Sequence, residues 1–226
     1  MSIILNIDTS AERAHISFAN DGLILHSIYS ESQKEHASFL QSAILELTKI
    51  TGVKLSDINA VAVTAGPGSY TGLRVAMASA KGLCYALKKP LITMNTLEVL
   101  ALSAIHLFPD IDESVLLCPM IDARRMEIFT AIYKKDLTIY LAPSALILDE
   151  FSFAKGLSEN KVLFFGSGSE KWKSICSYTN AIFENVSILP EAMSKHSFNL
   201  YFRNHFTDLA YSEPIYLKEF QTVIKP

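Results

Sequence analysis

The stretch Gly66-Pro67-Gly68-Ser69-Tyr70-Thr71-Gly72 decides the fold, because it joins an apolar run at Asn59–Ala65 to a long helical pattern. Glycines let backbone amides approach an anion, and the helix that follows directs the positive end of its dipole at the same place. The spacing fits neither a Walker loop, since no Lys-Ser/Thr follows Gly72, nor the G-x-G-x-x-G dinucleotide pattern. It therefore predicts either a phosphate or nucleotide site or a tight strand-to-helix turn, and both remain open.

Three short strand patterns and one helix precede this loop. Ser2–Ile7 and Ala14–Ala19 are strand-like, and the tight-turn signal Asn20-Asp21-Gly22 leads into a third run at Leu23–Tyr29. Apolar side chains then recur with a helical period over His36–Ile50. Because the run before the glycine loop is almost wholly apolar, we expect a central strand covered on both faces.

The helix after the loop, about Gly72–Leu87, is apolar on nearly every side, so we expect it to be buried nearly all round. Pro90 ends this element, and Leu91–Met94 is predicted to be a short strand. Thr96 is the predicted cap of a third helix that ends near Leu107. The first half of the chain thus follows the order β-β-β-α-β-α-β-α.

Strand patterns start again in the second half of the chain, which indicates a smaller second lobe. The predicted strands are Val115–Ile121, Glu127–Tyr133, Leu137–Leu141 and Val162–Phe165, and the predicted helices are Ala145–Phe153 and Glu191–Leu209. We expect an α/β protein with one lobe over residues 1–106 and a smaller lobe over residues 107–226, whose final segment packs back on the first.

Composition limits the function classes. The 226 residues include 20 Lys and Arg against 23 Asp and Glu, a formal charge of −3, and this balance disfavours autonomous binding of nucleic acid. Cys84, Cys118 and Cys176 are odd in number and far apart, so we expect reduced core residues. We recognise no export signal and no apolar run of membrane-spanning length, and expect a soluble cytoplasmic protein without a membrane partner.

Two segments carry polar residues at the ends of predicted strands. The hydroxyls and carboxylate of Asp8-Thr9-Ser10 suit a phosphate and a hydrated metal ion, although such residues commonly bond their own backbone in a turn. Asp122-Ala123-Arg124-Arg125 and Glu127 suit either a grip on an anion or a structural ion-pair cluster. Gly166-Ser167-Gly168-Ser169 is interpreted as a turn. The six histidines form no H-x-x-x-H pair, so no metal site is predicted.

Several of these motifs together resemble the bacterial TsaB (YeaZ) family. They are Ile7-Asp8-Thr9-Ser10, His36 on the first helix, Ala65–Arg74 and Ile121-Asp122-Ala123-Arg124. Pro214-Ile215-Tyr216-Leu217-Lys218 is similar to that family's Tyr-Leu-Arg ending. A lysine stands there in place of the arginine, and an ammonium does not reproduce a bidentate guanidinium contact.

The resemblance implies an actin/hexokinase/Hsp70-like (ASKHA, RNase H-like) fold of two lobes, the second reduced. It also implies a non-catalytic partner of TsaD, which transfers the threonylcarbamoyl group to the adenosine next to the anticodon of ANN-decoding tRNAs. Further implied partners are the ATPase TsaE, bound transiently, tRNA reached only through the complex, and a second copy of the chain in isolation. By alignment, Thr96 and Leu100 stand where the catalytic subunit has its metal-binding H-x-x-x-H.

The resemblance assigns roles to two groups of residues, neither of them catalytic or metal-binding. The vestigial phosphate-binding group is Asp8, Thr9, Ser10, Gly66, Gly68, Thr71 and Gly72. The partner-binding group, on the first two helices, is His36, Phe39, Leu40, Ala43, Leu73, Arg74, Met77, Ala78 and Lys81. Burial of that helical surface under the second lobe is the alternative.

No cofactor is implied, and weak binding of Mg-ATP or Mg-ADP is left open. The competing functions are a small ATP-dependent kinase or ATPase that uses Asp8 and the glycine loop and, last, a metallopeptidase-like protein.

Overall fold

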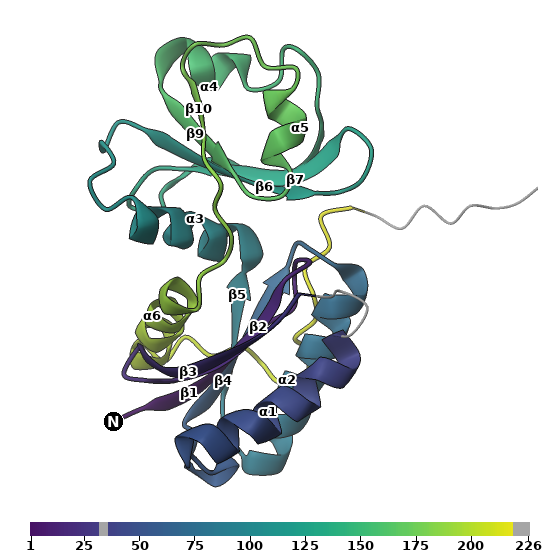
Figure 1. Ribbon diagram of the computed structural model, residues 1–226, viewed down its shortest axis with the longest axis vertical. Coiled ribbons are helices and arrows are strands. Elements are labelled where there is room, and N and C mark those ends of the chain that lie inside the picture. The colour runs from purple at the N-terminus through teal and green to yellow at the C-terminus, as the bar shows by residue number, and fades with distance from the viewer. Residues whose placement is uncertain (32–35, 219–226) are drawn as a thin grey trace, which may run out of the picture.

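The computed structural model describes residues 1–31 and 36–218, the side chains of residues 36–38 excepted. The chain forms two lobes, one below the other in Figure 1, and each is built on a five-stranded mixed sheet. The second lobe has the shorter helices. The expected α/β architecture of two lobes, the second reduced, is therefore confirmed.

The first lobe contains the three N-terminal strands and the two longest helices. Its elements are β1 (Ile3–Asp8), β2 (Ala14–Asn20), β3 (Leu23–Ser30), α1 (His36–Thr51), the 3-10 helix η2 (Leu55–Asp57), β4 (Ala60–Gly66), α2 (Tyr70–Leu87) and β5 (Leu91–Asn95). The strand order is β3-β2-β1-β4-β5, in which the first three strands are antiparallel and β4 and β5 run parallel to β1.

The second lobe repeats this topology with smaller parts. Its elements are β6 (Leu116–Asp122), β7 (Glu127–Tyr133), β8 (Ile139–Ile147), α4 (Ala154–Glu159), β9 (Val162–Phe165), α5 (Ser169–Lys173) and β10 (Ala181–Phe183). Its order, β8-β7-β6-β9-β10, has the same antiparallel and parallel pairings as the first sheet. In this comparison β6 corresponds to β1, and β9 corresponds to β4.

Two further helices, α3 (Thr96–Leu107) and α6 (Pro190–Phe202), lie between the sheets (Figure 1). Apolar side chains of α3 pack in the core of the second sheet, and α6 packs on β1 and β3 of the first sheet. Each of these helices therefore follows one sheet in the sequence and helps to cover the other. Val99 of α3 also contacts the first sheet, so this helix belongs to both lobes. The predicted boundary after residue 106 places almost all of it in the first lobe.

Residues 207–218, here called the C-terminal strap, run along the first lobe and reach the second. The Thr207 N–H donates to the Leu91 carbonyl at 2.9 Å, and the Ile215 N–H donates to the Ala65 carbonyl at 2.7 Å. The half-buried Leu217 side chain packs against the core of the second lobe. The strap therefore holds both lobes in one arrangement.

Most predicted elements agree with the structure within two residues, and β7 and β9 agree at both ends. One helix prediction is wrong, because Ala145–Phe153 holds the end of β8 and the loop before α4. The helix predicted over Glu191–Leu209 ends at Phe202. The cap of α3 is Asn95 and not Thr96, since the Asn95 Oδ1 atom accepts the N–H groups of the first turn.

The three cysteines are free thiols, as expected, although Cys176 is only half-buried. Burial raises the pKa of Cys84 to about 11 and that of Cys118 to about 12, so both stay protonated at neutral pH. Over the described residues, the structure contains no helix with the length and apolar character that a membrane crossing requires.

Candidate functional site

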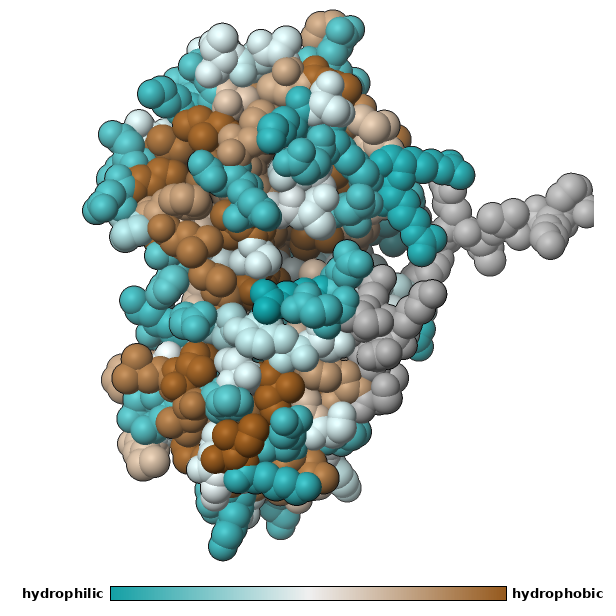
Figure 2. All heavy atoms as spheres, viewed as in Figure 1, coloured by the Kyte–Doolittle hydropathy of each residue, from teal (hydrophilic) through white to brown (hydrophobic). Residues whose placement is uncertain are grey.

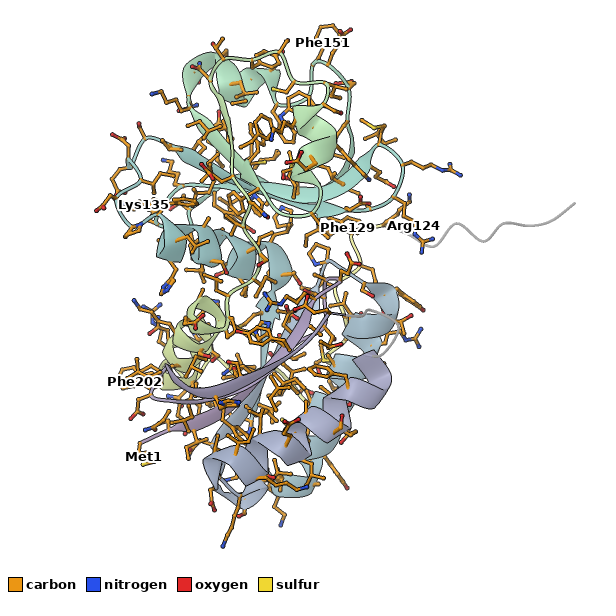
Figure 3. The ribbon with its side chains drawn as sticks, in the orientation of Figure 1. Met1, Arg124, Phe129, Lys135, Phe151 and Phe202 are labelled. Atoms are coloured by element: carbon orange, nitrogen blue, oxygen red, sulfur yellow. The ribbon has the colours of Figure 1, made fainter. Side chains whose placement is uncertain are left out.

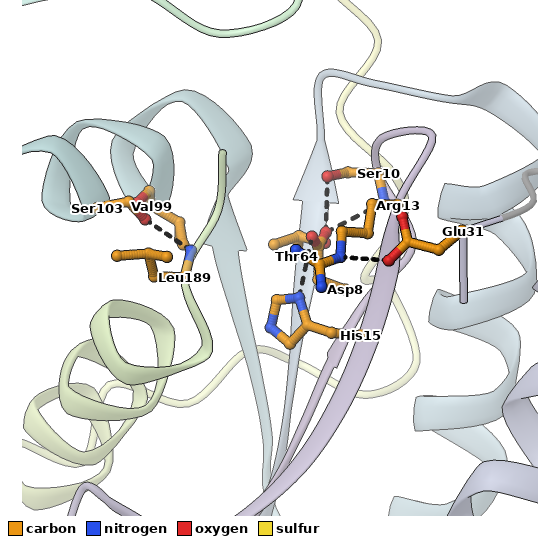
Figure 4. A network of polar contacts seen from close by, with 9 residues as sticks. All are labelled: Asp8, Ser10, Arg13, His15, Glu31, Thr64, Val99, Ser103 and Leu189. Atoms are coloured by element: carbon orange, nitrogen blue, oxygen red, sulfur yellow. Dashed lines mark hydrogen bonds and ion pairs between the residues drawn. The ribbon is translucent and has the colours of Figure 1, made fainter. Parts of the chain in front are cut away.

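The predicted polar motif at the end of β1 centres on the Asp8 carboxylate, which is only 1% exposed. Its Oδ1 atom accepts three hydrogen bonds, from the Ser10 N–H at 3.1 Å, the Ser10 hydroxyl at 2.6 Å and the Thr64 hydroxyl at 2.6 Å (Figure 4). Three donors of the same lobe thus stabilise a buried anionic oxygen.

The second Asp8 oxygen, Oδ2, lies 3.6 Å from Nδ1 of His15, the residue paired with Asp8 in the β1–β2 ladder (Figure 4). Burial lowers the pKa of His15, and the charge of Asp8 opposes this shift only in part. His15 is therefore neutral at physiological pH. Among the described residues, neither Asp8 Oδ2 nor His15 Nε2 has a hydrogen-bond partner.

The glycine loop packs directly on the Asp8–Ser10 turn. The Ser69 N–H donates to the Ser10 carbonyl at 2.7 Å, and the Thr9 hydroxyl donates to the Gly72 carbonyl at 2.7 Å. A side chain at Gly68 would meet this turn, since a Cβ atom there would lie 2.3 Å from the Ser10 oxygen. The two loops thus hold each other and fix the start of α2.

The strap closes the other side of the loop. Gly66 has a φ of +123°, and a Cβ atom there would lie 2.5 Å from the Ile215 carbonyl oxygen. The structure therefore brings Asp8, Thr9, Ser10, Gly66, Gly68 and Gly72 together, while Thr71 is exposed on the first turn of α2. Their phosphate-binding role stays a prediction. The Thr9 hydroxyl donates to the Gly72 carbonyl, and the Ser10 hydroxyl donates to the Asp8 carboxylate. The Ile215 backbone lies against Gly66 and fills part of the space beside the loop.

No group of three or more His, Cys, Asp or Glu side chains within the described ranges is placed to hold a metal ion. Thr96 and Leu100, which the resemblance places at the metal-ligand positions of a catalytic subunit, lie buried on α3.

Four of the predicted partner-binding residues are buried in the first lobe: Leu40, Ala43, Leu73 and Met77. In the isolated chain they support the helical surface from below, and their contact with a partner stays a prediction. Phe39 is half-buried against the core of this lobe. His36 begins α1, and its side chain lies outside the described residues.

The other three predicted partner-binding residues lie on α2. Ala78 and Arg74 are exposed, and the Arg74 guanidinium donates to the Tyr70 hydroxyl. Lys81 is held by the strap, because its ammonium group donates to the Ala210 carbonyl at 3.1 Å and the Ser212 carbonyl at 2.9 Å.

The outer face of α2 is exposed, which corrects the expectation that this helix is buried nearly all round. Ala78, Gly82 and Ala86 recur every four residues on this face, and we call them the α2 stripe. Tyr85 beside the stripe is 81% exposed, and Leu45 on the neighbouring α1 is 56% exposed. The four-residue spacing of small residues is the sequence signal that could have identified this face.

A second exposed apolar patch was not predicted from the sequence. It includes Leu23 and Leu25 on β3, and Phe202 at the end of α6. Figure 2 shows hydrophobic side chains gathered over this part of the first lobe. β3 is an edge strand, and its side chains point alternately to the two faces of the sheet. Both features leave apolar side chains of this strand uncovered.

At the end of β6, the charged motif forms ion pairs with distant lysines. The Lys171 ammonium lies 2.8 Å from Asp122, and the Lys218 ammonium lies 2.5 Å from Glu127. The structural ion-pair interpretation is correct for both carboxylates. Their partners come from α5 and the strap, and not from the neighbouring arginines.

Comparison with known proteins decides the family. The chain matches the family described as TsaD, tRNA N6-adenosine threonylcarbamoyltransferase, over residues 24–203. It is 32% identical to the tRNA threonylcarbamoyladenosine biosynthesis protein TsaB of Escherichia coli (strain K12) over 133 residues, or 59% of this chain and 55% of that protein. It superposes on YeaZ from Pseudomonas aeruginosa with a TM-score of 0.75 and 26% identity, covering 96% of this chain and all of that one. The chain belongs to the TsaB/YeaZ family.

The fold assignment has independent support from a more distant structure. An inorganic polyphosphate/ATP-glucomannokinase from Arthrobacter sp. strain KM superposes with a TM-score of 0.53 at 13% identity, which covers 90% of this chain. This likeness concerns the fold alone, and it confirms the ASKHA-like, two-lobed arrangement that the resemblance to the TsaB/YeaZ family implied.

Proposed function

We propose that this TsaB/YeaZ chain is the non-catalytic partner of a TsaD subunit. In this role it supports transfer of the threonylcarbamoyl group to the adenosine next to the anticodon of ANN-decoding tRNAs. The observation that carries the proposal is the exposed face of α1 and α2, which presents small and apolar side chains on regular helices. Family membership supplies the pathway.

The α2 stripe suits a helix of another protein. Small residues repeated every four positions let a second helix approach closely, and large neighbours such as Tyr85 and Leu45 then fill the grooves beside it. Gly82 has no neighbouring heavy atom within 4 Å of where a Cβ atom would stand, so this face is open in the isolated chain.

The Asp8–Ser10 turn and the glycine loop support a structural rather than a catalytic role. The Thr9 and Ser10 hydroxyls donate to Gly72 and Asp8 of the same lobe, and Gly66 lies against the strap. These groups would have to exchange internal bonds for bonds to a nucleotide. They serve here to position α2, which carries the proposed contact.

Co-elution of the chain with its cognate TsaD in size-exclusion chromatography at micromolar concentration tests the proposal. Gly82→Leu adds a large side chain where the isolated chain has open space, so it should leave the melting temperature unchanged or raised. We expect it to weaken association about 5-fold to 150-fold, because overpacking at a contact costs about 1–3 kcal/mol.

Ser158→Leu is the matched control, since it adds the same side chain at an exposed helix position in the second lobe. Co-elution of the Gly82→Leu variant with TsaD, as for the wild type, would show that α2 is not part of the interface. Separate elution of the two wild-type proteins would overturn the proposal itself. Without TsaD, the same face should pair with a second copy, and Gly82→Leu should convert that dimer to monomer in sedimentation.

Two assays separate this function from the kinase alternative. Modification of a tRNA transcript by TsaD with its donor-forming enzyme should depend on this chain. Calorimetric titration of the isolated chain with Mg-ATP should give little heat, and tight binding would favour a kinase or ATPase.

A further inference from the structure

The hairpin tip between β6 and β7 has an unusual backbone for its sequence. Arg124 and Arg125 have φ angles of +71° and +50°, a left-handed conformation in two consecutive residues. The Asp122 carboxylate accepts the Arg124 N–H at 2.6 Å, and the Glu127 N–H donates to the Arg124 carbonyl at 3.1 Å. Left-handed backbone favours Gly and Asn over residues with long side chains, so two arginines here lower stability without an evident gain for the fold.

The charges around the tip do not cancel. The Asp122 carboxylate pairs with Lys171, and the Glu127 carboxylate pairs with Lys218. Both arginines are exposed, and in the described part of the chain neither guanidinium has a hydrogen bond or an ion pair. The six charged groups leave two positive charges in excess, although the whole chain has a formal charge of −3.

The corresponding hairpin of the first lobe shows the contrast. There the arginine after β1, Arg13, lies 2.9 Å from the Glu31 carboxylate and 4.3 Å above the Tyr29 ring. That arginine is held by its own lobe. Figure 3 places Arg124 at the outer edge of the second lobe, on the side that faces the first lobe.

We infer that the Arg124–Arg125 tip binds the phosphate backbone of RNA brought to the assembly. This inference rests on the proposed function, which supplies the tRNA. Guanidinium groups match phosphate oxygens with paired hydrogen bonds and stay charged at all physiological pH values. The tip offers one exposed apolar side chain, Met126, and so lacks the apolar centre typical of a protein contact.

An RNA-binding tip is compatible with the formal charge of −3, which disfavours only autonomous binding of nucleic acid. Two phosphate contacts are too few for tight binding by the isolated chain at physiological salt, but they add to the contacts made by a partner subunit. The tip therefore orients RNA that the assembly already holds.

The test uses the full chain with its cognate TsaD and a fluorescently labelled transcript of an ANN-decoding tRNA. In Arg124→Asn/Arg125→Gly both charges are removed and the two left-handed positions receive residues that tolerate this conformation, so the melting temperature should stay equal or rise. We expect association with TsaD to be unchanged and RNA affinity in about 0.1 M salt to fall about tenfold. The slope of log K against log salt concentration should decrease by about 2.

Two controls sharpen the result. Lys155→Gln/Lys161→Gln removes two charges from exposed positions elsewhere in the second lobe and should leave RNA affinity unchanged. Arg124→Lys/Arg125→Lys keeps the charge and should retain most of the salt slope, with a smaller loss of affinity because the paired hydrogen bonds are lost.

Unchanged RNA affinity and slope in the Asn-Gly variant would overturn the inference. Loss of co-elution with TsaD in that variant would also overturn it, because the tip would then be a protein contact. Failure of the wild-type pair to co-elute is a separate result, seen before RNA is added, and it counts against the proposed function. The isolated chain is therefore also titrated with RNA in about 0.02 M salt, where loss of binding in the variant supports the inference and equal binding overturns it.

Discussion

The two lobes share one strand order but differ in their helices. In the first lobe, α1 and α2 have 16 and 18 residues, whereas the corresponding α4 and α5 have 6 and 5 residues. The sheets need helices only to cover their apolar faces, so the second lobe does this with short helices and large aromatic side chains such as Trp172. The long helices of the first lobe exceed what cover requires, and their outer face is the proposed contact surface.

The aspartates that end the first strand of each lobe, Asp8 and Asp122, lie in different surroundings, whereas both lobes have a glycine at the end of the fourth strand. Asp8 ends β1 and is buried among hydroxyl donors, whereas Asp122 ends β6 and is exposed beside a lysine. Gly66 ends the fourth strand of its lobe and Gly166 follows the fourth strand of its own, both at positive φ and each with a carbonyl oxygen close to where a Cβ atom would stand. Both lobes therefore need a glycine with positive φ at this point of the fold, whereas the side chains around it differ between the lobes.

The largest expected effect tests whether the two glycines are equally constrained. At Gly166 a Cβ atom would lie 2.4 Å from the Met120 oxygen of central strand β6, and at Gly66 it would lie 2.5 Å from the Ile215 oxygen of the strap. The strap can move away, but the central strand cannot. We expect Gly166→Ala to lower the free energy of unfolding by about 3 kcal/mol and Gly66→Ala by about 2 kcal/mol. Equal losses in urea titrations would contradict this difference.

The junction between the lobes should respond to pH. Burial lowers the pKa of His196 on α6 to about 4, below its usual 6.5, and this side chain lies 3.4 Å from Glu98 on α3. As the pH falls from about 6.5 to about 4, the unfolded chain binds a proton that folded His196 does not bind. This histidine therefore removes stability, by up to about 2–3 kcal/mol.

The carboxyl of Glu98 acts in the opposite sense, because burial raises its pKa and the folded state binds its proton first. Urea titrations at pH 7 and pH 5 separate the two groups. His196→Gln should reduce the loss of stability at the lower pH, and Glu98→Gln should increase it. A His196→Gln variant with the wild-type pH dependence would show that the junction does not titrate in this range.

A smaller effect compares the two aspartates. Asp8→Asn replaces a buried acceptor of three hydrogen bonds with an amide, and we expect a loss of about 2 kcal/mol. Asp122→Asn removes one exposed partner of Lys171 and should cost about 0.5 kcal/mol or less. Thermal unfolding of both variants measures the difference, and similar losses would mean that the two strand ends are equivalent.

Local patterns in the sequence predicted nearly all of the first lobe, because its strands and helices have clear periods and the glycine loop marks one boundary. They failed at Ala145–Phe153, where β8 is an edge strand whose mixed apolar residues also fit a helix. Spacing could not predict that Lys171 would pair with Asp122 or that Ile215 would cover Gly66. These contacts join residues far apart in the chain and depend on the folded arrangement of both lobes.

The C-terminal strap also has a consequence for how the chain is made. During synthesis both sheets leave the ribosome before the strap does, so Gly66 at the end of β4 and Leu91 on the edge strand β5 stay uncovered until residues 207–218 emerge. The first lobe also waits for α6, which covers β1 and β3. The contacts that position the lobes and complete the cover of the first sheet therefore form only late in synthesis.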